Sequence, residues 1–417
     1  MRIAVIGSGI SGLTAARLLS SEHDVTVFEA GGYIGGHTHT VDVAWEGRTY
    51  AVDTGFIVFN DRTYPHFVAL MRRLGVGGKP SNMSFGVKCE KTGLEYSPST
   101  PDSLFCQRRN LANPAFYRMI VDIFRLRRAA PALIAGEDDD LTLGDYLRQN
   151  GYSRGFIQHF IIPMGAAIWS AGLSGFARFP ARLFAEFFTH HGFLTIRNQP
   201  QWYVIEGGSR SYIPPLTAPF RDRIRIDTPV LSLSRQPDHV ELTLSGGVRE
   251  RFDQAVVATH SDQALALLSD PSAEERRILG EIPFQENRVV LHTDTAVLPE
   301  NRRAWASWNY RIPREETDTA TVTYNMNLLQ GIEAPVTFCV SLNPGDSVRP
   351  DRILQTFTYH HPVYTPRSLR ARRERDRING VNRTWFCGAY WGYGFHEDGV
   401  NSALAVCRHF GKGIEHA

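Results

Sequence analysis

The chain has 417 residues, a length that is typical of two or three folding units. Hydrophobic residues make up 42% and charged residues 21%, which excludes a disordered, collagen-like or disulfide-scaffold protein. The formal net charge of +2 argues against a nucleic-acid-binding protein. Only four of the 45 basic residues are lysines, namely Lys79, Lys88, Lys91 and Lys412, so chemistry that depends on a lysine has few candidates.

The cysteines and the uncharged stretches indicate the compartment. Five cysteines, an odd number without a C-x-x-C pair, predict neither a disulfide framework nor a metal site, as is usual in a reducing cytosol. The N-terminus shows no signal-peptide pattern. The longest stretch without Asp, Glu, Lys or Arg runs from Gly155 to Ala177 and is interrupted by Pro163. We expect it to be a buried tunnel wall or a membrane-touching surface rather than a span, and the protein to be cytoplasmic or peripheral on the inner membrane.

The first thirty residues carry the fingerprint of a dinucleotide-binding unit. A short β-branched strand, Arg2–Ile6, runs into a G-x-G-x-x-G turn, an apolar helix follows, and a second strand, Asp24–Phe28, ends at an acidic residue. The glycines allow a tight turn, close approach of a pyrophosphate to the backbone, and close packing of helix on strand, while the helix N-terminus offers N–H groups to the phosphates. The cofactor-binding residues predicted here are Gly7, Gly9, Ser11, Gly12, Glu29 and Ala30.

A second glycine pair, seven residues after Glu29, indicates which dinucleotide is bound. The stretch E-A-G-G-Y-I-G-G-H-T resembles the E-x₅-G-G segment of the flavin amine oxidase superfamily, which includes phytoene desaturases, protoporphyrinogen oxidase and polyunsaturated fatty-acid isomerases. The following Asp53-Thr54-Gly55-Phe56 resembles the D-x-G-G edge of that family. Arginines usually flank the glycine pair, whereas this chain has Gly31 and His37. The resemblance implies that FAD is contacted by Gly35, Gly36, His37, Thr54, Gly55 and Phe56.

The C-terminal segment resembles the last strand and helix of the same superfamily. The strand Thr384–Phe386 is followed by a glycine-rich stretch, and a helix is expected to begin near Asn401. In the family the N-terminus of this helix points at the flavin, so the resemblance implies backbone N–H donors at Gly399 and Val400. It also places Gly388 and Glu397 at the cofactor, and Val230 of the 225–230 strand over the adenine. Aromatic residues at this place frame the substrate, which makes Trp391 and Tyr393 candidate catalytic residues.

The remaining segments predict two interleaved domains. The expected fold class is α/β: a Rossmann-type FAD-binding domain interleaved with an α+β substrate domain of antiparallel sheet and helices, as in amine oxidases. The FAD-binding domain is expected to comprise 1–60, 200–265 and 380–417, and the substrate domain 61–199 and 266–379. Expected helices are 63–74 and 114–130, and expected strands are 202–205, 231–233, 240–244, 252–259, 288–292, 304–309, 320–325 and 337–342.

Histidines are the candidate bases for transfer of a hydride to a flavin. His361 and His360, which precede Pro362 in the Y-H-H-P sequence, are the first choice, and His396 and His292 are further candidates. Many amine oxidases have a lysine near flavin N5, but Arg288 stands in the matching strand. No cysteine occurs near Tyr359–Tyr364, so the FAD is expected to be non-covalent.

Three sequence segments resemble those of a bacterial subgroup of these flavoproteins. The segments are A-W-A-S-W-N-Y, V-T-Y-N-M-N-L-L-Q and F-T-Y-H-H-P-V-Y. Members of the subgroup are often encoded beside methyltransferases that resemble cyclopropane-fatty-acid synthase, and one is a desaturase of furan fatty-acid synthesis. The resemblance implies desaturation or isomerisation of a fatty-acyl chain, with a methyltransferase as pathway partner.

Other functions remain open at this point. The first alternative is oxidation of a small amine with oxygen, and the second is a flavin-binding module without activity. On the 114–130 helix, Arg118, Arg125 and Arg128 form either a solvated face or a contact with lipid phosphates. Six phenylalanines between Phe176 and Phe193 form either an ordinary core or the wall of an apolar tunnel.

Overall fold

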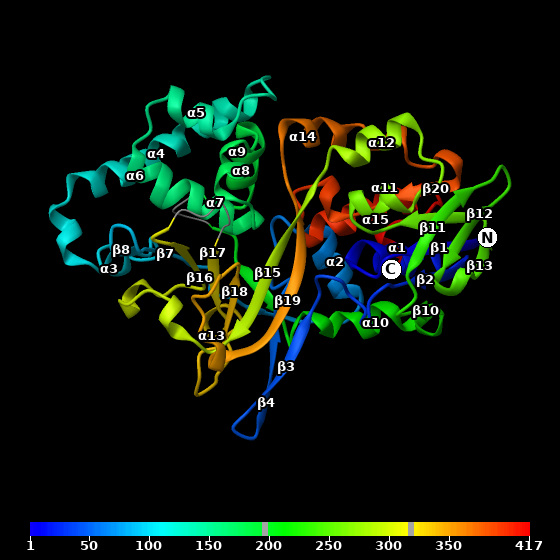
Figure 1. Cartoon of the computed structure of the whole chain (residues 1–417), viewed down its shortest axis with the longest axis horizontal. Helices are drawn as coiled ribbons and strands as arrows, with labels where there is room; N and C mark the ends of the chain where they lie inside the picture. The colour runs from blue at the N-terminus through cyan, green and yellow to red at the C-terminus, as the bar shows by residue number, and fades with distance from the viewer. Residues whose placement is uncertain (194–198, 316–320) are drawn as a thin grey trace.

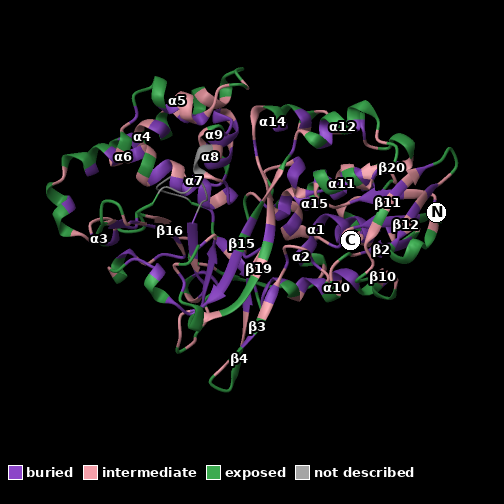
Figure 2. Cartoon of the chain, viewed as in Figure 1, coloured by how far each residue is buried: buried purple, intermediate pink, exposed green. Residues whose placement is uncertain are grey.

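The computed structural model describes residues 1–193, 199–315 and 321–417. Figure 1 shows a parallel sheet with both chain ends on one side of the molecule and a group of helices on the other. A large mixed sheet lies between them, and its two longest strands, β15 and β19, run along the middle of the molecule. Figure 2 shows that its inner strands are largely buried, whereas β19 at its edge is mostly exposed or half-buried.

The parallel sheet has five strands in the order β10-β2-β1-β14-β20, and every neighbouring pair is parallel. This order is that of a dinucleotide-binding fold. The strands are β1 (Arg2–Ile6), β2 (Asp24–Phe28), β10 (Ile224–Arg225), β14 (Gln254–Val257) and β20 (Thr384–Phe386). All five fall in the segments 1–60, 200–265 and 380–417, as the glycine motifs predict, although the exact domain limits remain a prediction.

Two layers cover the parallel sheet, one on each face. Alternate residues of a strand point to opposite faces, so β1 has apolar side chains for both layers. Ile3 and Val5 pack against α1 (Ile10–Leu19) and α15 (His396–Arg408). Ala4 and Ile6 pack against an antiparallel meander and two helices. These are β11 (Val230–Arg235), β12 (Val240–Leu244), β13 (Arg249–Phe252), α11 (Ser261–Leu267) and α12 (Ala273–Gly280).

The meander corrects two expected strands. The 225–230 strand is two elements, because the chain turns at Asp227, which has a positive φ of 49°, between β10 and β11. The 252–259 strand is also two elements, β13 and β14, which belong to different sheets. Asp253 lies between them and binds the start of β1, where its carboxylate accepts a hydrogen bond from the backbone N–H of Arg2 at 2.6 Å.

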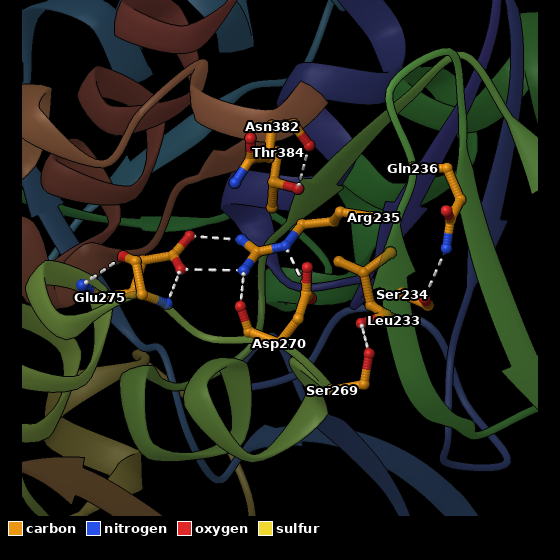
Figure 3. Close-up of polar contacts among 10 residues, drawn as sticks. Leu233, Ser234, Arg235, Gln236, Ser269, Asp270, Glu275, Asn382 and Thr384 are labelled. Atoms are coloured by element: carbon orange, nitrogen blue, oxygen red, sulfur yellow. Dashed lines mark hydrogen bonds and ion pairs between the residues drawn. The ribbon is translucent and has the colours of Figure 1, made fainter.

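A buried ion pair ties the meander to α12 (Figure 3). Arg235 of β11 and Glu275 of α12 have side chains that are each 1% exposed, and they form two hydrogen bonds, one of 3.0 Å from Nη2 to Oε2. Asp270 completes the site, since its carboxylate accepts from Arg235 Nε at 3.0 Å and its carbonyl oxygen accepts from Nη2 at 2.7 Å. The guanidinium is therefore held on both sides, as a buried charge requires.

The central mixed sheet has seven strands in the order β19-β15-β18-β17-β16-β7-β8, antiparallel except for the β16–β7 pair. Its strands are β7 (Phe85–Cys89), β8 (Leu94–Tyr96), β15 (Phe284–His292), β16 (Trp308–Ile312), β17 (Thr321–Asn325), β18 (Cys339–Leu342) and β19 (Ile353–Pro362). The expected 304–309 strand is wrong, because Arg302–Ala304 form a 3₁₀ turn and β16 begins only at Trp308.

Two smaller sheets connect the central and parallel sheets. One pairs β3 (Thr40–Trp45) with β4 (Arg48–Asp53), and the other has the order β5-β9-β6. Its strands are β5 (Val58–Asn60), β6 (Gly78–Pro80) and β9 (Trp202–Ile205).

His292 at the end of β15 makes the mixed sheet sensitive to acid. The ring is fully buried, its Nδ1 accepts from the N–H of Asp294 at 3.1 Å, and its Nε2 lies 2.8 Å from Ser341 Oγ. Burial lowers the pKa of His292 to about 4.

Between pH 4 and 6.5 the unfolded chain therefore binds a proton at His292 that the folded chain does not, so the free energy of unfolding falls as the pH falls. Between about pH 7.5 and about pH 5, wild type should lose about 2 kcal/mol more than His292→Gln in urea titrations. Equal losses in the two proteins would contradict this assignment.

The helical part encloses an aromatic core. Its helices are α3 (Pro101–Leu104), α4 (Pro114–Ala135), α5 (Leu143–Gln149), α6 (Arg154–Phe156), α7 (Ile162–Trp169), α8 (Leu173–Ala177) and α9 (Ala181–His190). The α4 helix extends five residues beyond the expected 130, and Thr142 caps α5, with Oγ1 accepting from Asp145 N at 3.1 Å. The remaining helices are α2 (Pro65–Arg73), α10 (Ile213–Thr217), α13 (Met326–Leu329) and α14 (Pro366–Arg373).

The uncharged 155–177 stretch lies in α6–α8, where Phe156, Ile161 and Trp169 are buried. In the part of the chain that the structure describes, none of the helices combines the length and the apolar character needed to cross a membrane.

Candidate cofactor and active site

The first glycine turn leaves an open position at the N-terminus of α1. Gly7 has φ +103°, and a Cβ at Gly12 would lie 2.0 Å from Gly7 O, so both glycines are required by the chain itself. A Cβ at Gly9 would have no protein atom within 4 Å. The first α-helical hydrogen bond runs from Leu13 N to Gly9 O, no side chain caps the helix, and no acidic residue stands in its first turn. The N–H groups of Ile10, Ser11 and Gly12 thus fit a phosphate.

The second glycine loop lies against this open position. Gly9 and Gly35 form an isolated parallel bridge, and a Cβ at Gly36 would lie 3.2 Å from Gly9 Cα. Glu29 stands between the two loops at the end of β2, where its carboxylate accepts from Ser8 N at 3.0 Å and from Gly31 N at 2.8 Å. A carboxylate at this place suits a ribose hydroxyl. The sequence did not single out Ser8, and Ala30 is exposed beside Glu29.

The predicted segment from Thr54 to Phe56 joins the glycine loops to the C-terminal helix. A Cβ at Gly55 would lie 2.2 Å from His37 O, which accepts a hydrogen bond from Phe56 N at 2.6 Å. The Phe56 ring stacks on His396, with centroids 3.5 Å apart. Thr54 Oγ1 lies 2.8 Å from the hydroxyl of Tyr359 on β19.

Asp53 holds a third glycine segment, residues 207–209, next to the two glycine loops. Its carboxylate accepts from Ser209 N at 2.9 Å and from Gln330 Nε2 at 2.7 Å. A Cβ at Gly208 would lie 2.6 Å from Thr40 Cγ2. Burial raises the pKa of Asp53 to about 6, against the opposing effect of these hydrogen bonds.

The C-terminal helix differs from the prediction in the residue at which it begins and in the contacts that its first residues make. It begins at His396 rather than near Asn401. The N–H of Gly399 is used inside the helix, where it donates to Phe395 O at 3.0 Å, so it is not the free donor that the resemblance implied. A Cβ at Gly399 would lie 2.6 Å from Ile10 Cγ2, which shows that this glycine lets α15 approach the start of α1. Val400 is fully buried beside it.

Glu397 and Gly388 also have partners within the chain. The Glu397 carboxylate accepts from the backbone N–H groups of His66 at 3.1 Å and Phe67 at 2.8 Å, so it caps α2 instead of facing a ligand. Gly388 N donates to Ser402 Oγ at 2.9 Å. Val230 begins β11, next to Leu244 of β12.

Four histidines from distant segments gather where the parallel sheet meets β19. The ring centroid of His37 lies 5.2 Å from that of His361 and 6.5 Å from that of His260, and the His260 and His360 centroids are 5.9 Å apart. Burial lowers the pKa values of His37 and His260 to about 4, and that of His361 also falls well below its usual range. The Nε2 atom of His37 is buried and has no hydrogen-bond partner among the described residues, as expected at a binding surface. The predicted residues His37, His360 and His361 thus come together, and His260 is a further member.

Asn287 of β15 determines which ring nitrogen of neutral His361 carries the proton. Its Oδ1 accepts from Asn343 Nδ2 at 2.7 Å, so its Nδ2 is the donor toward His361 Nδ1, 2.8 Å away. A neutral His361 therefore carries its proton on Nε2. The sequence did not single out Asn287.

The two aromatic candidates lie in different surroundings. Tyr393 faces the aromatic helical core: its ring centroid is 5.5 Å from that of Phe187, and its carbonyl oxygen accepts from Trp169 Nε1 at 3.1 Å. Trp391 packs instead with Tyr390 and Ile378 in the core on the meander side of the parallel sheet. Trp391 therefore does not belong to the aromatic wall that Tyr393 joins, contrary to the expectation that both frame one substrate.

The chain is similar to known proteins in sequence and in fold. Residues 10–328 match the family described as flavin-containing amine oxidoreductase. No curated protein sequence matches the chain.

Three solved structures show the likeness in fold. Cyclohexylamine oxidase from Brevibacterium oxydans has a TM-score of 0.71 at 16% identity, covering 98% of this chain and 99% of that one. A fatty acid isomerase from P. acnes, described as producing CLA, has a TM-score of 0.69 at 15% identity, covering 98% of each chain. Putrescine oxidase bound to putrescine has a TM-score of 0.69 at 13% identity, with 98% and 99% covered. The match over most of the sequence, together with the glycine loops and the fold, shows that the chain is an oxidoreductase of the flavin-containing amine oxidoreductase family.

Proposed function

We propose that the protein is an FAD-dependent oxidoreductase that desaturates or isomerises a fatty-acyl chain, free or on a phospholipid. The observation that carries the proposal is the continuous aromatic wall between the helices and the cofactor region. Phe187 of α9 stacks on Phe395, just ahead of α15, with centroids 5.2 Å apart, and it also contacts Trp169 and Tyr393. Such a wall favours an apolar substrate in a dry site, as transfer of a hydride to a flavin requires.

The residues present fit a non-covalently held FAD. The α1 N-terminus and the loops at Gly9 and Gly35 would hold its pyrophosphate, and Glu29 its ribose. All five cysteines are buried, and none lies in the histidine group, which supports non-covalent binding. When bound, the flavin would supply a hydride acceptor at N5.

The charges around β15 weigh against an amine oxidase with a lysine at the flavin. Arg288, in the strand that matches the lysine strand of many amine oxidases, is exposed and donates to Gly345 O at 3.3 Å. The buried neighbour that faces the histidine group is Asn287, a neutral side chain. Lys412, which is buried, pairs with Glu22.

His361 is the proposed hydrogen-bond donor at the site. Because its Nδ1 accepts from Asn287, its Nε2–H can orient a reacting group, and its low pKa keeps the ring neutral. We expect His361→Phe to lower the rate of flavin reduction by substrate about 100-fold, while flavin content stays the same. Asn287→Leu should lower it less, because His361 is then no longer held in one tautomer, while burial among the other histidines still keeps the pKa of the ring low. An unchanged rate of flavin reduction in both variants would exclude this role.

Product analysis tests the proposed reaction directly. Purified protein loaded with FAD is incubated with linoleoyl phosphatidylcholine in detergent, and the acyl chains are analysed for conjugated dienes. A conjugated diene with the same hydrogen count indicates isomerisation, and a chain with two hydrogens fewer indicates desaturation. Unchanged lipid, together with a flavin that dithionite reduces normally, would refute the proposal.

Oxidation of a small amine by oxygen is the second candidate. Glu186 favours it: one oxygen of this partly buried carboxylate pairs with Arg182 Nε at 3.0 Å, and the other lies 3.5 Å from the hydroxyl of Tyr393, where it could also pair with an ammonium group. Peroxide release on a panel of aliphatic amines, with unchanged lipid in the first experiment, would favour this alternative.

A further inference from the structure

The outer face of α4 is apolar where a solvated helix would be polar. Large apolar side chains there are about half exposed: 53% for Leu111 in the turn before the helix, 43% for Tyr117, 50% for Val121 and 47% for Phe124. The last three follow the i, i+4, i+7 spacing of a single helix face, which at about 100° per residue lies opposite the buried Met119 and Leu126. We call these four residues the α4 stripe.

Arginines surround the α4 stripe without exposed acidic residues among them. Along α4 the sequence has four arginines and a single acidic residue, Asp122, while Arg108 in the preceding turn pairs with the exposed Asp102. Asp122 is fully buried and binds Arg125 Nη1 at 2.6 Å, Arg118 Nε at 3.5 Å and Ser153 N at 2.8 Å. Among the residues that the structure describes, no ion pair or hydrogen bond involves the side chain of Arg128. The surface is therefore both apolar and positively charged.

A groove of about 530 Å³ lies beside the α4 stripe, between α4 and α5. Val121 and Phe124 of the stripe line it, together with Arg128. Tyr152 lines its floor, and the guanidinium of Arg125 lies 4.6 Å above the centre of that ring. A groove with aromatic walls and two arginines suits a phosphate group with an attached apolar chain.

We propose that the α4 stripe and its groove dock the protein on a membrane surface that contains anionic phospholipid. The helix would lie in the plane of the surface, with Val121 and Phe124 at the boundary between headgroups and acyl chains, Tyr117 at headgroup level, and Arg128 on a lipid phosphate.

The charge pattern favours a lipid surface over a protein partner. Arginines flank the apolar stripe on both sides: Arg127 on one side, Arg118 and Arg125 on the other, with Arg128 within it. Arginine and aromatic residues also occur in protein interfaces, but an apolar stripe along one exposed helix that is edged by basic residues alone is typical of helices that bind at a bilayer surface.

Docking through this face would place the apolar helical core between the membrane and the cofactor region. The inner face of α4 packs on α9, whose Phe187 reaches Phe395. Figure 1 shows α4 on the side of the molecule that lies away from the parallel sheet, so the cofactor domain would remain in water. The inference goes beyond the proposed function, since it concerns where the protein binds and not what it converts.

Vesicle sedimentation tests the docking surface. The full-length protein with FAD is mixed with vesicles of phosphatidylcholine alone or with phosphatidylglycerol added, at low salt and at about 0.5 M salt. We expect binding to the anionic vesicles that weakens with salt, at least about tenfold weaker binding for V121S/F124S, and weaker binding with a smaller salt dependence for R127Q/R128Q.

The matched control carries the same kinds of substitution on the far side of the molecule. L231S/V248S on the meander, where these side chains are 56% and 53% exposed, should bind vesicles as wild type does. The proposal is overturned if wild type does not bind anionic vesicles, or if V121S/F124S binds as wild type does while keeping its FAD. It is also overturned if the substitutions abolish a dimer or another protein complex instead of vesicle binding. Vesicle binding without lipid conversion would refute the proposed reaction and leave the docking surface standing.

Discussion

Gly9→Val should give a folded protein that binds flavin at least about 100-fold more weakly than wild type, a loss of about 2.7 kcal/mol. A Cβ at Gly9 meets no protein atom within 4 Å, and its φ of −69° and ψ of 176° are values that valine adopts readily, so the fold should tolerate the change. The added methyl groups would occupy the space in front of the α1 N-terminus, where the pyrophosphate is expected. Flavin titration followed by fluorescence measures the effect, and circular dichroism checks the fold.

Gly12→Ala is the matched control, because it should fail for a different reason. Its Cβ would lie 2.0 Å from Gly7 O, a backbone atom that cannot move aside without breaking the turn between β1 and α1. We expect loss of the fold or a large drop in Tm. The assignment of the cofactor loop would be contradicted if Gly9→Val bound flavin normally.

Glu275→Leu should lower the free energy of unfolding by about 3–5 kcal/mol, because it leaves the guanidinium of Arg235 buried without its main partner. The double variant R235M/E275L should recover most of that loss, since it removes both charges and keeps apolar volume. Urea titrations of the two variants measure the difference. A single variant as stable as wild type, or a double variant as unstable as the single one, would show that the pair does not support the meander.

The same ion pair predicts a dependence on pH. Although burial opposes it, the hydrogen bonds from Arg235 leave the pKa of Glu275 below its usual value. Its contribution to stability is therefore present above about pH 4.5 and is lost as the pH falls through the folded pKa.

The parallel sheet of the dinucleotide-binding fold could be predicted from the sequence, because the motifs that indicate it lie within short segments. The turn from Gly7 to Gly12 needs a positive φ and close backbone contacts within six residues. Only glycine meets both needs, so the glycine pattern alone predicts the turn. The strands β1, β2 and β20 begin and end where the sequence predicts. The loops at Gly35 and Gly55 likewise come together as the resemblance implied.

The parts that the sequence did not predict depend on contacts between distant segments. The early start of α15 accompanies the stacking of His396 on Phe56, which lies 340 residues earlier in the chain. Glu397 accepts hydrogen bonds from the N-terminus of α2, another distant segment. The histidine group joins residues after β2 and β14 with a pair on β19, so no local pattern could indicate it. Trp391 and Tyr393 are separated by a single residue, yet they point into different cores, because the glycines around them turn the chain.

The solved structures of similar fold include enzymes whose names refer to amines as well as a fatty acid isomerase, so the substrate must be inferred from the site itself. The features that differ from a lysine-dependent amine oxidase are Asn287 and the outward-facing Arg288. Together with the aromatic wall around Phe187, they favour a neutral, apolar substrate.

Anaerobic single-turnover spectroscopy distinguishes a lipid substrate from an amine substrate. Protein loaded with FAD is mixed, without oxygen, with linoleoyl phosphatidylcholine in one arm and with cyclohexylamine and putrescine in the other, and the oxidised flavin absorbance is followed. One equivalent of flavin can accept one hydride, so no external acceptor is needed. We expect the lipid to remove the oxidised flavin absorbance, lastingly if the reaction is a desaturation and transiently if it is an isomerisation, and we expect no change with the amines. Rapid reduction by an amine, with no reduction by the lipid, would contradict it.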